Sequence, residues 1–218
     1  MHITRDEYLR ISHFANGVTV LGPGSRTVIW VQGCPFSCAG CIAPEARDPH
    51  GGEQVRVQDF VCSITDDPST EGLTFSGGEP MEQAGALTSL VKQIRAERDI
   101  GVMCYTGYRL EHLQQHDNAD QIELLKEVDL LVDSPYVAEL HADLLWRGSS
   151  NQRLLALTDR YRPFVESLGS ETDRSAGLQF HLGDSGTLIY VGVPPTPDFR
   201  NGFENAMAKH GIRLEADS

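Results

Sequence analysis

The chain of 218 residues lacks the long apolar runs that a membrane span requires. Residues 1–7 also lack the basic segment, apolar segment and cleavage site of a signal peptide. We therefore expect a cytoplasmic protein with no membrane partner. Basic residues are few, since 18 Lys and Arg stand against 31 Asp and Glu, for a formal net charge of −13. Phosphate contacts need basic surface, so nucleic acid is not an expected partner.

Cysteine is scarce as well, and its placement excludes a disulfide framework. The chain has five cysteines, and three of them lie within eight residues in the run Cys34-Pro-Phe-Ser-Cys38-Ala-Gly-Cys41. In a reducing compartment such a group predicts metal binding. The other two, Cys62 and Cys104, stand among apolar neighbours, which favours buried structural thiols.

The three-cysteine run offers one thiolate too few for a closed tetrahedral site. Three cysteines can instead hold a 4Fe–4S cluster in which one iron is free to bind another ligand. Zinc, with His50 or a distant residue as the fourth ligand, is the alternative. Zinc sites usually combine two cysteine pairs, however, and only one Cys-x-x-Cys spacing occurs here. We therefore expect Cys34, Cys38 and Cys41 to bind an iron–sulfur cluster.

Apolar runs and helical periodicity alternate along much of the chain and predict an α/β fold. The predicted strands are residues 18–21, 27–31, 72–75, 102–105 and 128–132, and the predicted helices are residues 55–64, 81–96, 110–114 and 120–127. Such alternation favours a parallel sheet with helices packed upon it. Later segments predict a polar loop (166–176), a β-hairpin (178–182 and 187–191, around the turn 183–186) and a terminal helix (199–210). We expect a core over residues 1–157 and a C-terminal extension over residues 158–218.

Polar and glycine-rich motifs stand at the carboxyl ends of the predicted strands. They are the cysteine run, Ser76-Gly-Gly-Glu-Pro80, Tyr105-Thr-Gly-Tyr108 and Asp133. Since the carboxyl ends of parallel strands meet at one edge of a sheet, we expect these motifs to form one site. Gly77 and Gly78 permit close backbone approach to a ligand, and Glu79 can add charge or orient the turn. The alternative is an ordinary strand-to-helix turn with Pro80 at the first helical position.

Four segments together resemble the anaerobic ribonucleotide reductase-activating proteins, a family of radical S-adenosylmethionine (SAM) enzymes. These segments are residues 22–34, 74–80, 105–108 and 146–153. The resemblance implies an incomplete (β/α) barrel that binds one 4Fe–4S cluster and SAM. It also implies reductive cleavage of SAM to methionine and a 5′-deoxyadenosyl radical. That radical would generate a glycyl radical on a partner enzyme such as an anaerobic ribonucleotide reductase, with flavodoxin or ferredoxin as electron donor.

The resemblance also implies roles for individual residues. Cys34, Cys38 and Cys41 would ligate the cluster. The residues that would face SAM are Gly77, Gly78 and Glu79 at the methionine moiety, and Tyr105, Thr106 and Asp133 at the ribose or methionine part. Gly40 stands where most radical SAM enzymes place an aromatic residue near the adenine, and a glycine there is typical of this family. For residues 146–153, a packed turn and a partner-docking role are equally open.

Three departures from the family pattern leave the substrate open. Ala43 precedes Pro44 in a stretch where the family commonly has Asn, Ser134 replaces a usual glycine, and residues beyond 158 exceed the family core. The alternatives are a radical SAM enzyme that modifies another peptide or protein, and a non-catalytic scaffold that binds a cluster or zinc. The scarcity of further cysteines for auxiliary clusters argues against the first, and the intact Gly-Gly-Glu-Pro turn argues against the second.

Overall fold

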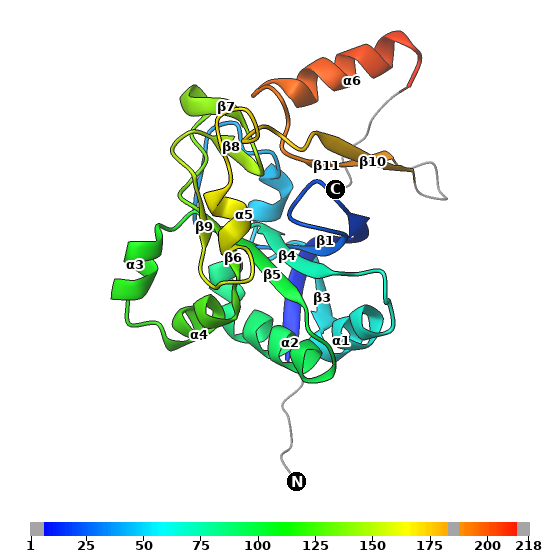
Figure 1. Cartoon of the computed structure of the whole chain (residues 1–218). Coiled ribbons are helices and arrows are strands. Elements are labelled where there is room, and N and C mark those ends of the chain that lie inside the picture. Colours follow the sequence, from blue (N-terminus) through cyan, green and yellow to red (C-terminus); the bar gives the residue numbers. More distant parts are fainter. Residues whose placement is uncertain (1–6, 183–187, 213–218) are drawn as a thin grey trace.

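A seven-stranded sheet with a parallel centre organises the computed structural model, which describes residues 7–182 and 188–212 (Figure 1). The strands run in the order β3 (Glu53–Arg56), β1 (Tyr8–Val18), β2 (Arg26–Val31), β4 (Gly72–Gly77), β5 (Gly101–Tyr105), β6 (Leu130–Asp133) and β9 (Arg153–Ala156). Strands β2, β4, β5 and β6 are parallel, whereas β1 is antiparallel to β2 and β3, and β9 to β6. The predicted α/β class with a parallel sheet is confirmed.

Four helices cover one face of this sheet: α1 (Val57–Thr65), α2 (Ala84–Glu97), α3 (Leu110–Gln115) and α4 (Ala119–Glu127). Because side chains alternate along a strand, Val102 and Cys104 of β5 face these helices, whereas Met103 and Tyr105 face the other way. We call the second face, which also carries Val28, the inner face. None of the helices in the described ranges combines the length and the apolar character that a membrane crossing requires.

The beginning of the chain differs from the prediction. Strand β1 ends at Val18, so the strand predicted over residues 18–21 is wrong. Val20 and Leu21 are apolar because the loop after β1 folds over the inner face, where both pack against Val28. Strand β1 has 11 residues, but few of them are buried. Its sequence therefore lacks the alternation of apolar and polar residues that would predict a strand. Also missed are the short strands β3, β7 (His141–Leu144), β8 (Arg147–Ser149) and β9.

A buried arginine ties the amino ends of the parallel strands together. Arg26, which is 0% exposed, donates from Nε to the Thr74 hydroxyl at 2.6 Å and from Nη2 to the Gly101 carbonyl at 3.1 Å. Its other hydrogen bonds go to the carbonyls of Pro23 and Leu73. Burial lowers the pKa of this guanidinium, so these acceptors compensate the removal of its charge from water.

The C-terminal extension lies against the inner face, on the side of the sheet away from α1 and α2 (Figure 1). After α5 (Arg162–Glu166), strands β10 (Leu178–Leu182) and β11 (Leu188–Gly192) pair antiparallel and precede α6 (Phe199–Lys209). Val191 is buried in the same apolar group as Val28. The Gln179 amide pairs with the Thr19 N–H and the Gly17 carbonyl, both at 2.9 Å. The turn predicted over residues 183–186 lies outside the described residues.

Candidate functional site

The cysteine run forms a loop that is closed at its base by hydrogen bonds. The Gly33 N–H donates to the Ala46 carbonyl at 2.8 Å, and the Cys34 N–H to the Arg47 carbonyl at 3.1 Å. The Gln32 side chain donates to the carbonyls of Glu45 and Asp48 at 2.9 and 2.7 Å. The far side of this loop is the short 3₁₀ helix η1 (Pro44–Arg47). This base fixes where the three cysteines begin, immediately after β2.

The three cysteines of this loop are half-buried free thiols. Burial raises the pKa of Cys34, and the charge of Glu79 and of the other two cysteines raises it further. Burial and the neighbouring Cys41 likewise raise the pKa of Cys38. The negative charges of neighbouring thiolates repel each other, and a soft metal centre that binds the thiolates relieves this repulsion. The donor set therefore fits a centre of high positive charge.

The three cysteines supply the number of thiolates that a 4Fe–4S cluster with one open iron binds. Across the described residues, no three His, Cys, Asp or Glu side chains converge as one metal ion would require. A 4Fe–4S cluster binds each of three thiolates at a different iron, so its ligands need not meet at one point. His50, the alternative zinc ligand, is exposed beyond the base of the loop, where its backbone N–H donates to the Asp48 carboxylate.

Gly77 and Gly78 pack directly on the base of the cysteine loop. The Gly78 N–H donates to the Val31 carbonyl at 2.7 Å, and the Glu79 N–H to the Gly33 carbonyl at 2.8 Å. A Cβ at residue 78 would lie 2.3 Å from the Gly33 oxygen, and Gly77 has a φ of +92°. Only glycine satisfies both conditions. The turn after β4 and the start of the cysteine loop are therefore one rigid unit.

Glu79 links this unit to the turn after β5. Its carboxylate is 1% exposed and accepts hydrogen bonds from the Met81 N–H at 3.0 Å, the Thr106 hydroxyl at 2.8 Å and the Gly107 N–H at 2.7 Å. Burial raises the pKa of Glu79 to about 7 despite these three donors. Its side chain is fully used within the protein, so its part in the site is to orient the turn. Pro80 then begins the 3₁₀ helix η2 (Pro80–Gln83), which leads into α2.

Two residues of the turn after β5 have different environments. The Thr106 hydroxyl donates to Glu79 and accepts from the Tyr108 N–H at 3.1 Å, so it is engaged within the protein. Tyr105 points to the inner face, and its buried hydroxyl has no hydrogen-bond partner among the described residues. A buried hydroxyl without a partner is costly. Among the side chains predicted to contact SAM, that of Tyr105 has unused hydrogen-bonding capacity.

Asp133 is buried in an ion pair rather than free in a pocket. Arg153 donates from Nε to one carboxylate oxygen at 2.9 Å and from Nη2 to the other, and the Leu110 N–H donates at 2.9 Å. Burial raises the pKa of Asp133, but these donors outweigh it and the pKa lies below its ordinary value. Arg153 also pairs with Glu111 at 2.8 Å. Asp133 thus joins the beginning of α3 to β9.

Residues 146–153 support the turn that follows Asp133. Ser134 has a φ of +81°, which explains why a glycine is usual at this position. The Gln152 side chain donates to the Ser134 carbonyl at 3.2 Å and accepts from the Gly148 and Ser149 N–H groups at 2.9 and 3.1 Å. Gly40, with a φ of +70°, faces Tyr136 just beyond this turn. The segment therefore packs against the turn that follows Asp133.

Two predictions about individual cysteines have different outcomes. Cys104 is buried in β5, as predicted. Cys62 is exposed on α1, so the prediction of a buried thiol is wrong there: Val61 faces the core, and the next residue points to solvent. The role of Arg153 was also missed, because a charged residue in a short edge strand carries no distinguishing sequence signal.

Known proteins are similar to this chain over the segment that holds the site. Residues 20–155 match the family model described as a 4Fe-4S single cluster domain. The anaerobic ribonucleoside-triphosphate reductase-activating protein of Enterobacteria phage T4 is 35% identical over 147 residues, which cover 64% of this chain and 89% of that protein. The protein of the same name from Escherichia coli K12 is 34% identical over 143 residues, 61% and 89% of the two chains.

A second kind of activating enzyme is also similar. The pyruvate formate-lyase 1-activating enzyme of Escherichia coli K12 is 31% identical over 153 residues, which cover 67% of this chain and 59% of that enzyme. The family match includes the cysteine loop, the glycine turn and the first three residues of β9, and it ends before the C-terminal extension. This chain therefore belongs to the 4Fe–4S single-cluster family of radical SAM enzymes that includes the glycyl-radical activating enzymes.

Proposed function

We propose that this protein is a radical SAM enzyme that generates a glycyl radical on an anaerobic ribonucleotide reductase. The observation that carries the proposal is the rigid unit of the cysteine loop and the glycine turn, joined by the Glu79–Gly33 hydrogen bond of 2.8 Å. Such a unit would hold a cluster, and an amino acid that chelates it, in a fixed position relative to each other. The two relatives named as reductase-activating proteins, each covered over 89% of its length, supply the partner class.

Different residues of this chain would bind the 4Fe–4S cluster and SAM. Cys34, Cys38 and Cys41 would ligate the 4Fe–4S cluster and leave one iron for the amino and carboxylate groups of SAM. When the cluster and SAM are both bound, they supply the reductive cleavage of SAM to methionine and a 5′-deoxyadenosyl radical. Carbonyl groups of the Gly77-Gly78 turn would accept hydrogen bonds from the methionine ammonium group.

Other residues would orient SAM or shape the space around it. The Tyr105 hydroxyl would donate a hydrogen bond to SAM, which would satisfy its unused capacity. Glu79, Thr106 and Asp133 would position the turns around the cofactor, because their polar groups are engaged within the protein. Gly40 would provide space at the adenine side, as a side-chain-free neighbour of Tyr136.

We also propose that the open sheet corresponds to the incomplete barrel of this enzyme class, with the core ending near residue 157. The described part of the extension, residues 158–182 and 188–212, would close the inner face, as the burial of Val191 beside Val28 supports. A closed inner face would protect the radical from solvent. The same closure would limit which partner segments reach SAM, so that the extension contributes to substrate choice.

The test is the direct observation of the radical on the partner. The reconstituted protein, SAM, a reductant and an anaerobic ribonucleoside-triphosphate reductase are mixed without oxygen, and the reductase is examined by electron paramagnetic resonance. We expect a glycyl-radical signal that Cys38→Ala abolishes and that Cys62→Ala, a matched change at an exposed cysteine outside the loop, preserves. SAM cleavage without any radical on the reductase would show that the partner is another protein or peptide.

A further inference from the structure

Arg47 is bound to the cysteine loop through both its backbone and its side chain. Its carbonyl accepts a hydrogen bond from the Cys34 N–H at 3.1 Å. Its guanidinium donates from Nη2 to the Cys38 carbonyl. Arg47 is half-buried and is the last residue of η1, on the far side of the loop. The residue therefore links two of the three predicted cluster ligands.

The positive charge of Arg47 is not neutralised by an acidic partner in the part of the chain that the structure describes. Within residues 7–182 and 188–212, no carboxylate forms an ion pair with this guanidinium. The carboxylate of Glu45 pairs with Arg200 of α6 at 3.6 Å instead. The Asp48 carboxylate accepts from the His50 backbone N–H at 2.9 Å. A hydrogen bond to a carbonyl leaves the charge of a guanidinium in place, so that this charge acts on the surrounding groups.

The Cys38 sulfur is one of the groups on which this charge acts. Burial and the neighbouring Cys41 raise the pKa of Cys38, whereas the charge of Arg47 lowers it. The backbone N–H groups of Tyr136 and of Cys38 itself also lower this pKa. Arg47 therefore favours negative charge on the sulfur of this ligand. Since net charge and hydrogen bonds at the sulfurs set the potential of an iron–sulfur cluster, the same cation would act on a cluster bound there.

We propose that Arg47 raises the reduction potential of the cluster that Cys34, Cys38 and Cys41 would hold, as a positioning residue that acts through Cys38. The inference rests on the proposed function, in which a one-electron reduction precedes each cleavage of SAM. A 4Fe–4S centre with three thiolate ligands is anionic, and the added electron increases its negative charge. A cation fixed beside this centre stabilises the reduced form more than the oxidised form. Arg47 therefore makes the cluster easier to reduce.

A purely structural role for Arg47 would not need the charge. The hydrogen bond from Cys34 uses the carbonyl of residue 47, which every amino acid has. The Gln32 side chain and the Ala46 carbonyl also hold the base of the loop, through hydrogen bonds of 2.7 to 2.9 Å. A neutral amide at residue 47 is still a donor for a carbonyl. The effect of the charge and the effect of the hydrogen bond can therefore be separated by substitution.

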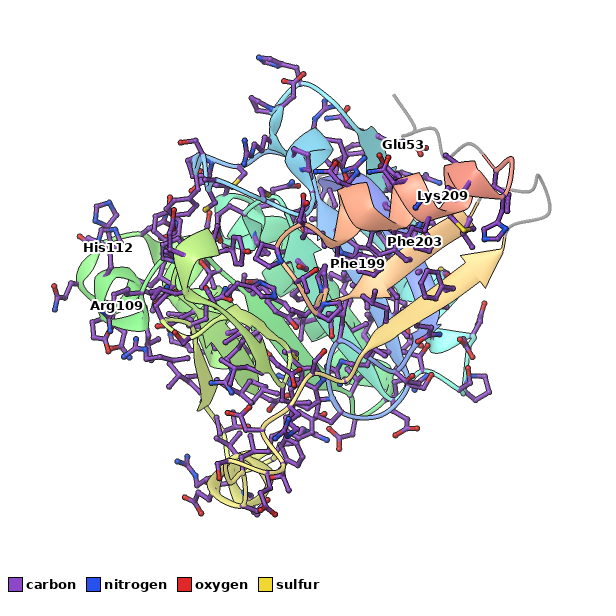
Figure 2. The ribbon with its side chains drawn as sticks, turned by 90° about the horizontal axis from the view of Figure 1, so that it is seen from above. Glu53, Arg109, His112, Phe199, Phe203 and Lys209 are labelled. Atoms are coloured by element: carbon purple, nitrogen blue, oxygen red, sulfur yellow. The ribbon has the colours of Figure 1, made fainter. Side chains whose placement is uncertain are left out.

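The test compares three variants of the reconstituted full-length protein with the wild type, in the absence of SAM. Arg47→Gln removes the charge and keeps a donor, whereas Arg47→Lys keeps the charge. Arg109→Gln is the matched control, because it removes a guanidinium that is 63% exposed and paired with Glu111 at 3.7 Å. Figure 2 shows Arg109 and His112 together at the outer edge of the molecule. The readouts are the iron and sulfide content and the midpoint potential, from an anaerobic redox titration followed by electron paramagnetic resonance of the reduced cluster.

We expect a moderate effect, because solvent screens a half-buried charge. In Arg47→Gln, the ratio of reduced to oxidised cluster at a fixed potential should be about tenfold lower, which is a fall of about 59 mV in the one-electron midpoint potential. Arg47→Lys should lower this ratio by less than about threefold, and Arg109→Gln should match the wild type. A change of less than about threefold in Arg47→Gln would overturn the proposal. A change of about threefold or more in Arg47→Lys would also overturn it, because the hydrogen bond and not the charge would then set the potential.

If Arg47→Gln takes up no cluster, Arg47→Lys decides the question. A Lys variant whose cluster has the potential of the wild type would support the proposal, because the charge alone then suffices to hold the anionic centre. A Lys variant without a cluster would overturn the proposal. Formation of 5′-deoxyadenosine with SAM and dithionite tests the proposed function separately. A wild type that forms none, but whose potential depends on Arg47 as described, would refute the proposed function and leave the role of Arg47 standing.

Discussion

Replacement of Glu79 by Gln tests whether a buried carboxylate joins the glycine turn to the turn after β5. The Glu79 carboxylate accepts three hydrogen bonds, from Met81, Thr106 and Gly107. A Gln side chain has one oxygen, so its amide would face at least one of these donors, most directly the Gly107 N–H. A buried donor left without an acceptor costs about 2 kcal/mol of unfolding free energy. The hydrogen-bond change alone therefore destabilises the variant.

The pKa of Glu79 adds an opposite, pH-dependent effect. Burial raises this pKa from 4.5 to about 7, so the folded protein binds more protons than the unfolded chain over that interval. The unfolding free energy of the wild type therefore falls as pH rises, by about 3 kcal/mol in total at about 1.4 kcal/mol per pH unit. Roughly 2 kcal/mol of this fall occurs between about pH 5.5 and 8. The Gln variant does not titrate and lacks the fall.

The assay is urea unfolding of the cluster-free protein at the two pH values, followed by tryptophan fluorescence. The stability advantage of the wild type over Glu79→Gln should shrink by about 2 kcal/mol between pH 5.5 and 8. Glu97→Gln, at an exposed carboxylate at the end of α2, should show the pH dependence of the wild type. Equal pH dependence of the wild type and Glu79→Gln would refute the reasoning, because it would mean that Glu79 ionises normally in the folded state.

Substitutions at three further positions, each measured by urea unfolding, test the contacts that support the site. Ser134→Gly should stabilise the protein by about 1 kcal/mol because the φ of +81° suits glycine, and Ser134→Ala should not. Arg26→Met should lower the unfolding free energy by about 3 kcal/mol because it leaves the carbonyls of Leu73 and Gly101 without their donor. A smaller loss of unfolding free energy would show that water replaces the guanidinium as donor. Asp133→Asn should destabilise the protein at neutral pH but less in acid, since a lowered carboxyl pKa stabilises the fold only while the group is ionised; a difference independent of pH would contradict this.

The sequence predicts the location of the site better than its internal contacts. The glycine turn and the cysteine run both follow apolar strands, so the edge of a parallel sheet is expected for them. The partners of Glu79 were not predictable, because Thr106 and Gly107 lie 27 and 28 residues away and meet it only through the pairing of β4 with β5. A carboxylate beside two glycines indicates ligand contact as readily as an internal link.

The fold shows the same division between local and long-range information. The helix pattern of Leu87, Leu90, Val91 and Ile94 was sufficient because a whole helix face is buried. Strand β1 was missed because most of its side chains lie outside the core, and Val20 and Leu21 gave a false strand because loops also bury apolar residues. Arg153 could not be assigned to Asp133 without knowing that β9 pairs with β6.

The central claim is that the cysteine loop and the glycine turn together support radical SAM chemistry. The most direct measurement is the formation of 5′-deoxyadenosine by the anaerobically reconstituted protein after reduction with dithionite. We predict a bound 4Fe–4S cluster and SAM-dependent 5′-deoxyadenosine, both lost in Cys38→Ala. A protein that takes up zinc without sulfide, or that binds SAM without cleaving it, would contradict the claim and identify the chain as a scaffold.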